Sequence, residues 1–138
     1  MIYLMDTDIL IDVALDRTPF FDSSARVFDL AEKRIFNAYI AWHSLSNFFY
    51  IVSSNGNEKL AKSFIREMLQ FVSVAPVRTE DALYASAMDF PDFEDALQVA
   101  SARACRAQKI ITRNLVHYRK SPIPAIDPKE LIVTFNIK

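Results

Sequence analysis

The chain has 138 residues, of which 51% are hydrophobic, and its formal net charge at pH 7 is -1. This length and apolar content predict one domain over residues 1–138 with a single core. The one cysteine, Cys105, excludes an internal disulfide, and the one glycine, Gly56, excludes a P-loop and a dinucleotide-binding glycine motif. We expect a cytoplasmic protein without a membrane span, because no signal-peptide pattern and no sufficiently apolar stretch is present.

Short apolar segments alternate with helical patterns along the chain. We expect strands at residues 2–5, 35–41, 71–75 and 109–112, with a short edge strand within 122–126. Helices are expected at 9–15, 20–33, 44–53, 58–70, 80–88 and 93–108, with a last helical turn at 128–131. Residues 55–57, Asn-Gly-Asn, give a C-cap signal between two of the helices. Strands separated by helices predict an α/β fold, with a mostly parallel sheet of four or five strands covered on both faces.

Acidic residues follow the first strand directly. Asp6 lies at the carboxyl end of this strand, where open α/β sheets place their ligands, and Asp8 is expected to cap the next helix. A second acidic cluster precedes or opens the helix at 93–108, and a polar turn, residues 112–114, follows the fourth strand. Convergence of these three segments would form an oxygen-ligand site for Mg²⁺ or Mn²⁺. The second cluster consists of Asp89, Asp92, Glu94 and Asp95.

Most of these motifs also have a purely structural interpretation. Asp92 is a good N-cap, and acids in a first helical turn are favoured by the helix dipole. Residues 44–47, Ser-Leu-Ser-Asn, look like a capping box with Asn in place of Glu or Gln. His43 and His117 are too few for a zinc site.

The basic residues are unevenly placed. Residues 101–120 contain six basic side chains and no acid, so ten basic and seventeen acidic side chains remain elsewhere, a net charge of -7. A basic strip beside an acidic centre is typical of a metal-dependent enzyme that acts on a polyanion, whereas the alternative is a solvated helix face. The six are Arg103, Arg106, Lys109, Arg113, Arg119 and Lys120.

Four motifs in order, at residues 6–12, 44–50, 92–102 and 110–118, make the chain resemble the PIN domain family, and in particular bacterial VapC-like ribonuclease toxins. The resemblance implies a Rossmann-like α/β/α fold whose acidic cluster holds one or two divalent ions that activate water against RNA. It also implies an RNA substrate, an antitoxin partner and a homodimer, with Arg113 and its basic neighbours binding RNA. The catalytic positions it implies are Asp6, Asn47, Asp95, Thr112 and Asn114. The metal ligands would be Asp6 and Asp95, with Asp92, Glu94 and His117 as further candidates.

Two positions depart from the family pattern. Asn47 stands where the second motif has Glu, and His117-Tyr118 stands where the fourth motif has Asp-Phe. Neither Asn nor His carries the negative charge that helps to hold a hard cation, so we expect weak metal binding and low activity. One alternative is a PIN-like module that binds RNA or a partner without catalysis. Another, ranked lower because the later acids open a helix, is a haloacid-dehalogenase-type phosphatase with Asp6 as nucleophile and Asp8 as general acid.

Aromatic residues are concentrated in two of the early helices. They could form a self-association surface or belong to the core, and the sequence leaves both interpretations open. They are Phe20, Phe21, Phe28, Phe48, Phe49 and Tyr50.

Overall fold

The structure is a computed structural model that describes residues 1–54 and 56–135. Its strands are β1 (Ile2–Met5), β2 (Asn37–Ile40), β3 (Val72–Val74), β4 (Lys109–Ile111) and β5 (Ala125–Ile126). Its helices are α1 (Thr7–Ala14), α2 (Phe21–Glu32), α3 (Trp42–Ser53), α4 (Glu58–Met68), α5 (Thr79–Ser86), α6 (Phe93–Ala104) and α7 (Pro128–Phe135), with a 3₁₀ turn, η1 (Leu115–Tyr118). No helix in these two ranges is long and apolar enough to cross a membrane.

The five strands form one parallel sheet in the order β3-β2-β1-β4-β5. The chain builds outward from β1 to β3 and then crosses back to place β4 on the other side of β1. The carboxyl ends of β1 and β4 are therefore neighbours at the point where the strand order reverses, and ligands of open α/β sheets bind in the crevice at such a point. The predicted α/β class and the predicted parallel sheet are confirmed.

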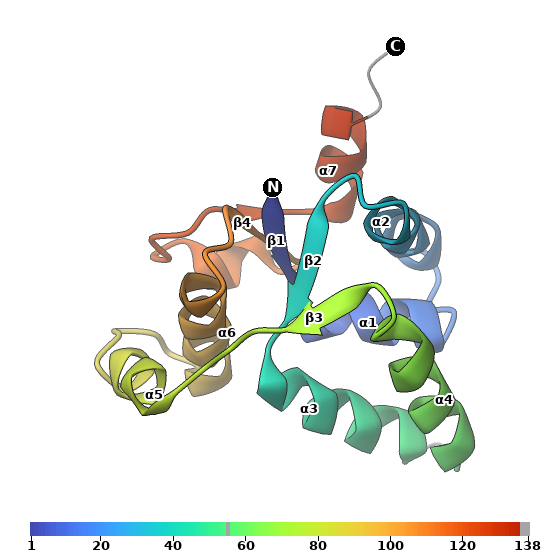
Figure 1. The fold of residues 1–138 in the computed structure, drawn as a ribbon, viewed down its shortest axis with the longest axis horizontal. Helices are drawn as coiled ribbons and strands as arrows, with labels where there is room; N and C mark the ends of the chain where they lie inside the picture. Colours follow the sequence, from blue (N-terminus) through green and yellow to red (C-terminus); the bar gives the residue numbers. More distant parts are fainter. Residues whose placement is uncertain (55, 136–138) are drawn as a thin grey trace.

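The two faces of the sheet are covered by different helices (Figure 1). Successive side chains of a strand point to opposite faces. Tyr3 and Met5 accordingly belong to the larger core cluster with α1 to α4 and α7, whereas Leu4 packs with α6 on the other face. The fold is thus the predicted three-layer arrangement, with α5 and α6 forming the thinner layer.

Several predicted helix boundaries were wrong, because other residues begin or end the helices than those predicted. Helix α1 begins at Thr7, and its N-cap is Asp6 rather than Asp8. Helix α3 begins at Trp42 after Ala41, so Ser44 lies inside the helix and the predicted capping box does not form. The last helix runs to Phe135, well beyond the single predicted turn, and η1 was not predicted.

The structure describes two of the three residues that form the predicted C-cap signal between α3 and α4. Gly56 has φ +79°, a left-handed conformation, and its N–H donates to the carbonyl of Ser53 (2.8 Å). Asn57 caps α4 by accepting from the N–H of Leu60 (3.2 Å). Asn55, the first residue of the signal, lies outside the described residues.

The early aromatic residues divide between core and surface. Phe48 is fully buried and its ring stacks on Phe64, and Phe28 is 9% exposed, so both belong to the core. Phe20 and Tyr50 are exposed, while Phe21 and Phe49 are half-buried. The core interpretation therefore holds for part of the set, and the homodimer stays a prediction.

Candidate active site

Asp6 is held by hydrogen bonds from three parts of the chain. It follows β1 directly, and its Oδ1 accepts from the backbone N–H of Thr7 (2.7 Å), which caps α1. Its Oδ2 accepts from the hydroxyls of Thr112 (2.9 Å) and Tyr118 (3.0 Å). This buried carboxylate is therefore held by neutral donors, and within residues 1–54 and 56–135 no cationic side chain is hydrogen-bonded to it.

The turn after β4 is tied to Asp8. The Oδ2 atom of Asp8 accepts from the backbone N–H of Arg113 (3.2 Å) and from Nδ2 of Asn114 (3.0 Å). The N–H of Asn114 in turn donates to the hydroxyl of Thr112 (3.0 Å). Asp8 is thus the anchor of this turn rather than a helix cap, while its Oδ1 is buried and has no hydrogen-bond partner among the described residues.

Helix α6 brings the second acidic cluster to the same edge of the sheet. Asp92 is the N-cap, as predicted, and accepts from the N–H of Glu94 (2.9 Å). Asp95 is buried in the first turn, where its Oδ1 lies 3.5 Å from the hydroxyl of Tyr118 and its Oδ2 lies 3.4 Å from Nδ1 of His117. Tyr118 therefore connects Asp95 to Asp6. Asp89 is exposed and pairs with Lys120 (3.5 Å).

The carboxylate of Glu94 lies beside the side-chain amide of Asn47. Its Oε2 accepts from Nδ2 of Asn47 (3.5 Å) and from Nε2 of Gln98 (3.1 Å), and it lies 3.0 Å from Nε2 of His43. Asn47 of α3 and Glu94 of α6 thus come together, so a carboxylate from α6 stands beside the position where the second motif has Glu.

A buried polar group beneath Glu94 was missed by the sequence analysis. Gln98 is fully buried, and its Nε2 contacts the hydroxyls of Ser44 (2.9 Å) and Thr7 (3.2 Å), which lie 2.7 Å from each other. This group joins α1, α3 and α6. The available signal was a Gln inside an otherwise apolar stretch of α6, residues 96–100, because a buried amide needs partners.

The acids raise one another's pKa. Burial, followed by the charge of Glu94, raises the pKa of Asp6. Burial and the charge of Asp6 raise the pKa of Asp8 to about 7, and burial with nearby carboxylates raises that of Asp95 to about 6. Only Glu94 is shifted down, chiefly by its hydrogen bond with His43. The site is a group of crowded carboxylates without enough positive charge, and a bound cation would relieve this crowding.

Arg113 forms an ion pair with a buried acid, and its role in RNA binding stays a prediction. Its Nε and a terminal nitrogen donate to the two carboxylate oxygens of buried Asp12 (2.6 and 3.0 Å), and its guanidinium lies 3.8 Å from the ring centroid of Phe20. Ser24 also donates to Asp12 (3.3 Å). This bidentate pair fastens the turn after β4 to α1, so that Arg113 is a positioning residue.

The predicted basic strip is not continuous. Helix α6 places Arg103 in its last turn, about 12 Å along the axis from Asp95, where the guanidinium stacks over Tyr84 (4.1 Å). Arg106 and Lys109 follow at the start of β4, at the amino ends of the strands. Of the predicted RNA-binding side chains, the exposed Arg119 and Lys120, next to η1, lie on the acidic edge, where Lys120 pairs with Asp89. RNA binding by the six basic residues stays a prediction.

The donors at this edge fit a hard divalent cation held mainly by water. Within the described ranges, no three His, Cys, Asp or Glu side chains are arranged to hold a metal ion by themselves. Mg²⁺ needs no such cage, because it is usually bound through one or two carboxylates and keeps several waters. Asp6 and Asp95, linked through one phenol, supply such a pair, and the unpaired Oδ1 of Asp8 is an additional acceptor for a cation-bound water.

The chain belongs to the PIN domain family, because the family's model matches residues 3–116. This membership replaces the phosphatase interpretation. A search of curated proteins gave no sequence match.

Solved structures of toxin–antitoxin systems share the fold. A chain in the structure of VapBC2 from Rickettsia felis, bound to a DNA fragment from their promoter, is 18% identical with a TM-score of 0.73, and the match covers 92% of this chain and 98% of that one. A toxin–antitoxin complex from Klebsiella pneumoniae gives 20% identity, a TM-score of 0.70, and 91% and 97% coverage. VapC20 from Mycobacterium tuberculosis, a sarcin-ricin loop cleaving toxin, is 16% identical with a TM-score of 0.63, and the match covers 78% of this chain and 86% of that one.

The first prediction concerns the pH dependence of stability without metal. Because the folded-state pKa of Asp95 is about 6 against 3.8 for the free side chain, the folded protein holds a proton that the unfolded chain releases. That contribution to stability is fully present below about pH 4 and is lost as the pH rises through 6. Asp95→Asn should therefore gain stability over the parent between pH 4.5 and 8, by on the order of 1 kcal/mol after solvent screening.

Urea unfolding at a series of pH values in EDTA measures this difference. Asp89→Asn is the matched control, since Asp89 is almost fully exposed and should show no such trend. A difference between Asp95→Asn and the parent that does not change with pH would contradict the crowding of acids.

The second prediction concerns Tyr118, whose hydroxyl lies between the two site acids. Burial raises the pKa of this phenol further above its usual value, so it stays a hydrogen-bond donor. A cation held by Asp6 and Asp95 must replace the contacts that the Tyr118 hydroxyl makes with these two carboxylates. Tyr118→Phe should therefore bind Mn²⁺ roughly 5-fold more tightly, the equivalent of one ordinary hydrogen bond, and should be less stable without metal.

Calorimetric titration with Mn²⁺ tests this, with Tyr50→Phe on the exposed face of α3 as control. Weaker Mn²⁺ binding by Tyr118→Phe would show that the phenol supports the metal instead of competing with it.

Proposed function

We propose that this protein is a metal-dependent endoribonuclease that hydrolyses RNA phosphodiesters with Mg²⁺ or Mn²⁺, and that it is the toxin of a toxin–antitoxin pair. The observation that carries the proposal is the convergence of Asp6, from the end of β1, with Asp95, from the first turn of α6, at the switch point of the sheet. Membership of the PIN family and the fold shared with toxin–antitoxin proteins support it.

Each residue at the edge has a distinct part in this proposal. Asp6 and Asp95 would hold the cation, and a cation there would lower the pKa of a bound water and neutralise charge on the phosphate. Thr112 orients Asp6 through its hydrogen bond (2.9 Å). Asn114 and Arg113 fix the turn by holding Asp8 and Asp12, which keeps Thr112 in place. Tyr118 holds the two acids together while no cation is bound.

Glu94 makes up part of the charge that Asn47 and His117 lack. Asn47 donates to Glu94 rather than approaching Asp6 directly, and the lowered pKa of Glu94 keeps it ionised at neutral pH. Glu94 is therefore the candidate acid for the second-motif position, acting through water, whereas His117 adds no negative charge beside Asp95. We expect low turnover compared with a site that has all its acids.

The third prediction tests the nuclease. Purified protein should cleave single-stranded RNA in Mg²⁺ or Mn²⁺, and Asp6→Asn should reduce the rate by about 100-fold or more, because the charge stabilisation that a metal supplies is worth several kcal/mol. Asn keeps the carbonyl that caps α1, so the variant should fold. Asp89→Asn serves as the control.

Cleavage of labelled RNA, with EDTA as a blank, provides the measurement. Failure of the parent to cleave any RNA in either metal, while it still binds RNA, would favour the catalytically inactive binding module. An Asp6→Asn variant as active as the parent would remove Asp6 from the site.

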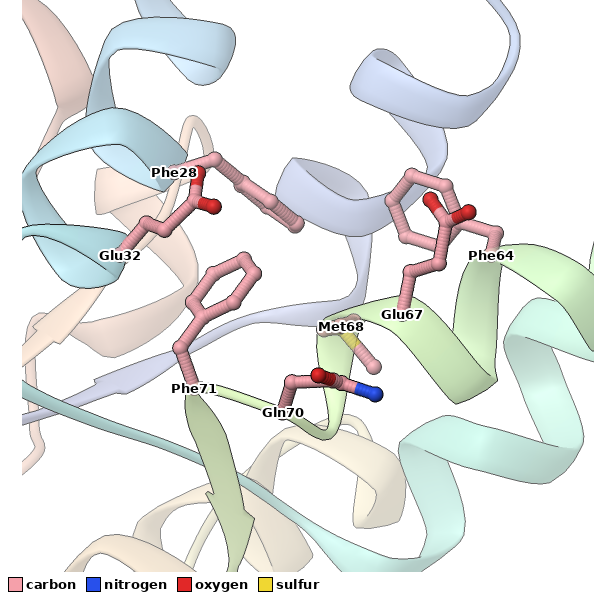
Figure 2. A pocket seen from close by; sticks show the side chains of 7 residues that line it. All are labelled: Phe28, Glu32, Phe64, Glu67, Met68, Gln70 and Phe71. Atoms are coloured by element: carbon pink, nitrogen blue, oxygen red, sulfur yellow. The ribbon is translucent and has the colours of Figure 1, made fainter.

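The partner part of the proposal rests on an apolar groove between α2 and α4 (Figure 2). Its volume is about 440 Å³, and the aromatic rings of Phe28, Phe64 and Phe71 form its wall together with Met68. The two ends of the groove carry acids and an amide, Glu32, Glu67 and Gln70. Glu32 and Glu67 are exposed, and neither forms an ion pair with any residue in the described ranges.

The apolar wall and the two exposed glutamates of this groove favour a peptide that is both apolar and basic. We assign it to an antitoxin segment that places apolar side chains on the phenylalanines and Lys or Arg beside the two glutamates. RNA is disfavoured here, since the rim is acidic and the basic side chains of the site lie on another edge.

The fourth prediction follows from this rim. If the reading frame next to the gene encodes the antitoxin, the two proteins should copurify after coexpression. The double variant Glu32→Lys/Glu67→Lys should lose the complex, because like charges then oppose across the interface. Glu58→Lys, in the first turn of the same helix α4 but outside the groove, is the control. Unchanged copurification of the double variant would place the partner elsewhere.

A further inference from the structure

A second hollow adjoins the acidic pair. It has a volume of about 330 Å³ and lies between the segment before α6 and the 3₁₀ turn η1. Asp95 and His117, both already described, form one side of it. The hollow therefore opens directly onto the place where a phosphodiester would meet the metal-binding acids.

The remaining walls combine apolar surface with two basic side chains and one further carboxylate, that of Asp92. Phe90 is half-buried, with part of the ring packed against the core and part lining the hollow, and Pro91 and Val116 extend this apolar wall. Val116 is 64% exposed, so its side chain is accessible to a ligand. Arg119 and Lys120, both exposed, also line the hollow. Lys120 pairs with Asp89 (3.5 Å), and this exposed pair is weak enough to open for a ligand.

We propose that this hollow is a nucleotide subsite, in which one unpaired base of the RNA lies against Phe90 while Arg119 and Lys120 hold the adjoining phosphate. The inference rests on the proposed function and names the form of its substrate. Every base has a π-face that stacks on an aromatic ring, and basic side chains follow the backbone in proteins that bind single strands. A base inside a duplex is already stacked on both faces, so the subsite selects single-stranded RNA.

The size and chemistry of the hollow fit this ligand. Its volume is at the lower end of the range for small-ligand pockets, roughly 300–1,000 Å³, which suits one nucleotide. Asp95 and His117 offer an acceptor and a ring nitrogen to the edge of a base or to a metal-bound water.

The fifth prediction is a loss of binding that depends on the base. In EDTA, where no metal-dependent cleavage occurs, a fluorescently labelled single-stranded oligoribonucleotide should bind Phe90→Leu roughly 5- to 100-fold more weakly than the parent, as expected for the loss of one stacked base. Leu keeps the apolar volume that packs on the core, so the variant should fold. Phe90→Trp should bind as tightly as the parent or more tightly.

Phe93→Leu is the matched control. Phe93 is also an aromatic residue near the start of α6 and is 55% exposed, but it does not line the hollow. An equal loss in Phe90→Leu and Phe93→Leu, or no loss in Phe90→Leu, would overturn the proposal. So would an equal effect of Phe90→Leu on inorganic polyphosphate, which has no bases.

A second measurement tests the phosphate side without disturbing the core. Lys120→Ala should weaken binding and lower the slope of log K against log salt by about 0.7, the value for one contact to a single strand, whereas Lys62→Ala on α4 should not. A slope unchanged in Lys120→Ala would remove this residue from the subsite.

These results separate the subsite from the nuclease. If the parent cleaves RNA in Mn²⁺ but Phe90→Leu has unchanged affinity and KM, the subsite fails and the proposed function stands. If the parent binds single-stranded RNA through Phe90 without cleaving it, the nuclease fails and the subsite stands.

Discussion

The site depends on one electrostatic constraint, which is the burial of several carboxylates together with too few cations. Asp6 and Asp95 are both buried, and in the described part of the chain the phenol of Tyr118 is the group that contacts both. The exposed imidazole of His117 lies beside Asp95. Such crowding lowers the stability of the protein without metal, since each charge disfavours ionisation of the next. Proteins keep an arrangement of this kind where a cation or a reaction requires it.

The cation in the turn after β4 is directed away from the acidic pair. Arg113 forms an ion pair with Asp12, one helical turn beyond Asp8, and its guanidinium lies over the ring of Phe20. This removes a positive charge from the acidic pair while fixing the turn that carries Thr112 and Asn114. The same arrangement explains how a short turn after a three-residue strand, Lys109–Ile111, can hold a catalytic geometry: it is bonded to α1 at Asp6, Asp8 and Asp12.

The sequence predicted those features that depend on neighbouring residues. The strand Ile2–Met5 was predicted to the residue, because four apolar residues end abruptly at Asp6. The convergence of Asp6 with Asp95 also followed, since strand ends and helix starts share an edge in a parallel sheet. The pairing of Arg113 with Asp12 spans 101 residues, so no local pattern could separate it from a free RNA-binding arginine.

The other differences come from tertiary contacts as well. Ser44 was predicted as a cap from its spacing to Asn47, yet it bonds Thr7 and Gln98 inside the layer between α1, α3 and α6. The hydroxyl of Tyr118 was passed over because Tyr stands where the family pattern has Phe, and only the structure places this hydroxyl between the acids. The basic run between residues 101 and 120 is divided because α6 and β4 carry it to opposite ends of the sheet.

The cation site formed by Asp6 and Asp95 is tested most directly by a crystal structure of the protein soaked with Mn²⁺, with the ion located by anomalous scattering. We expect a peak between these two carboxylates, with waters completing the coordination and the hydroxyl of Tyr118 displaced from Asp6. A peak at exposed acids such as Asp89 or Glu58 alone, with Tyr118 still bonded to Asp6 at saturating Mn²⁺, would show that the two acids do not form a cation site.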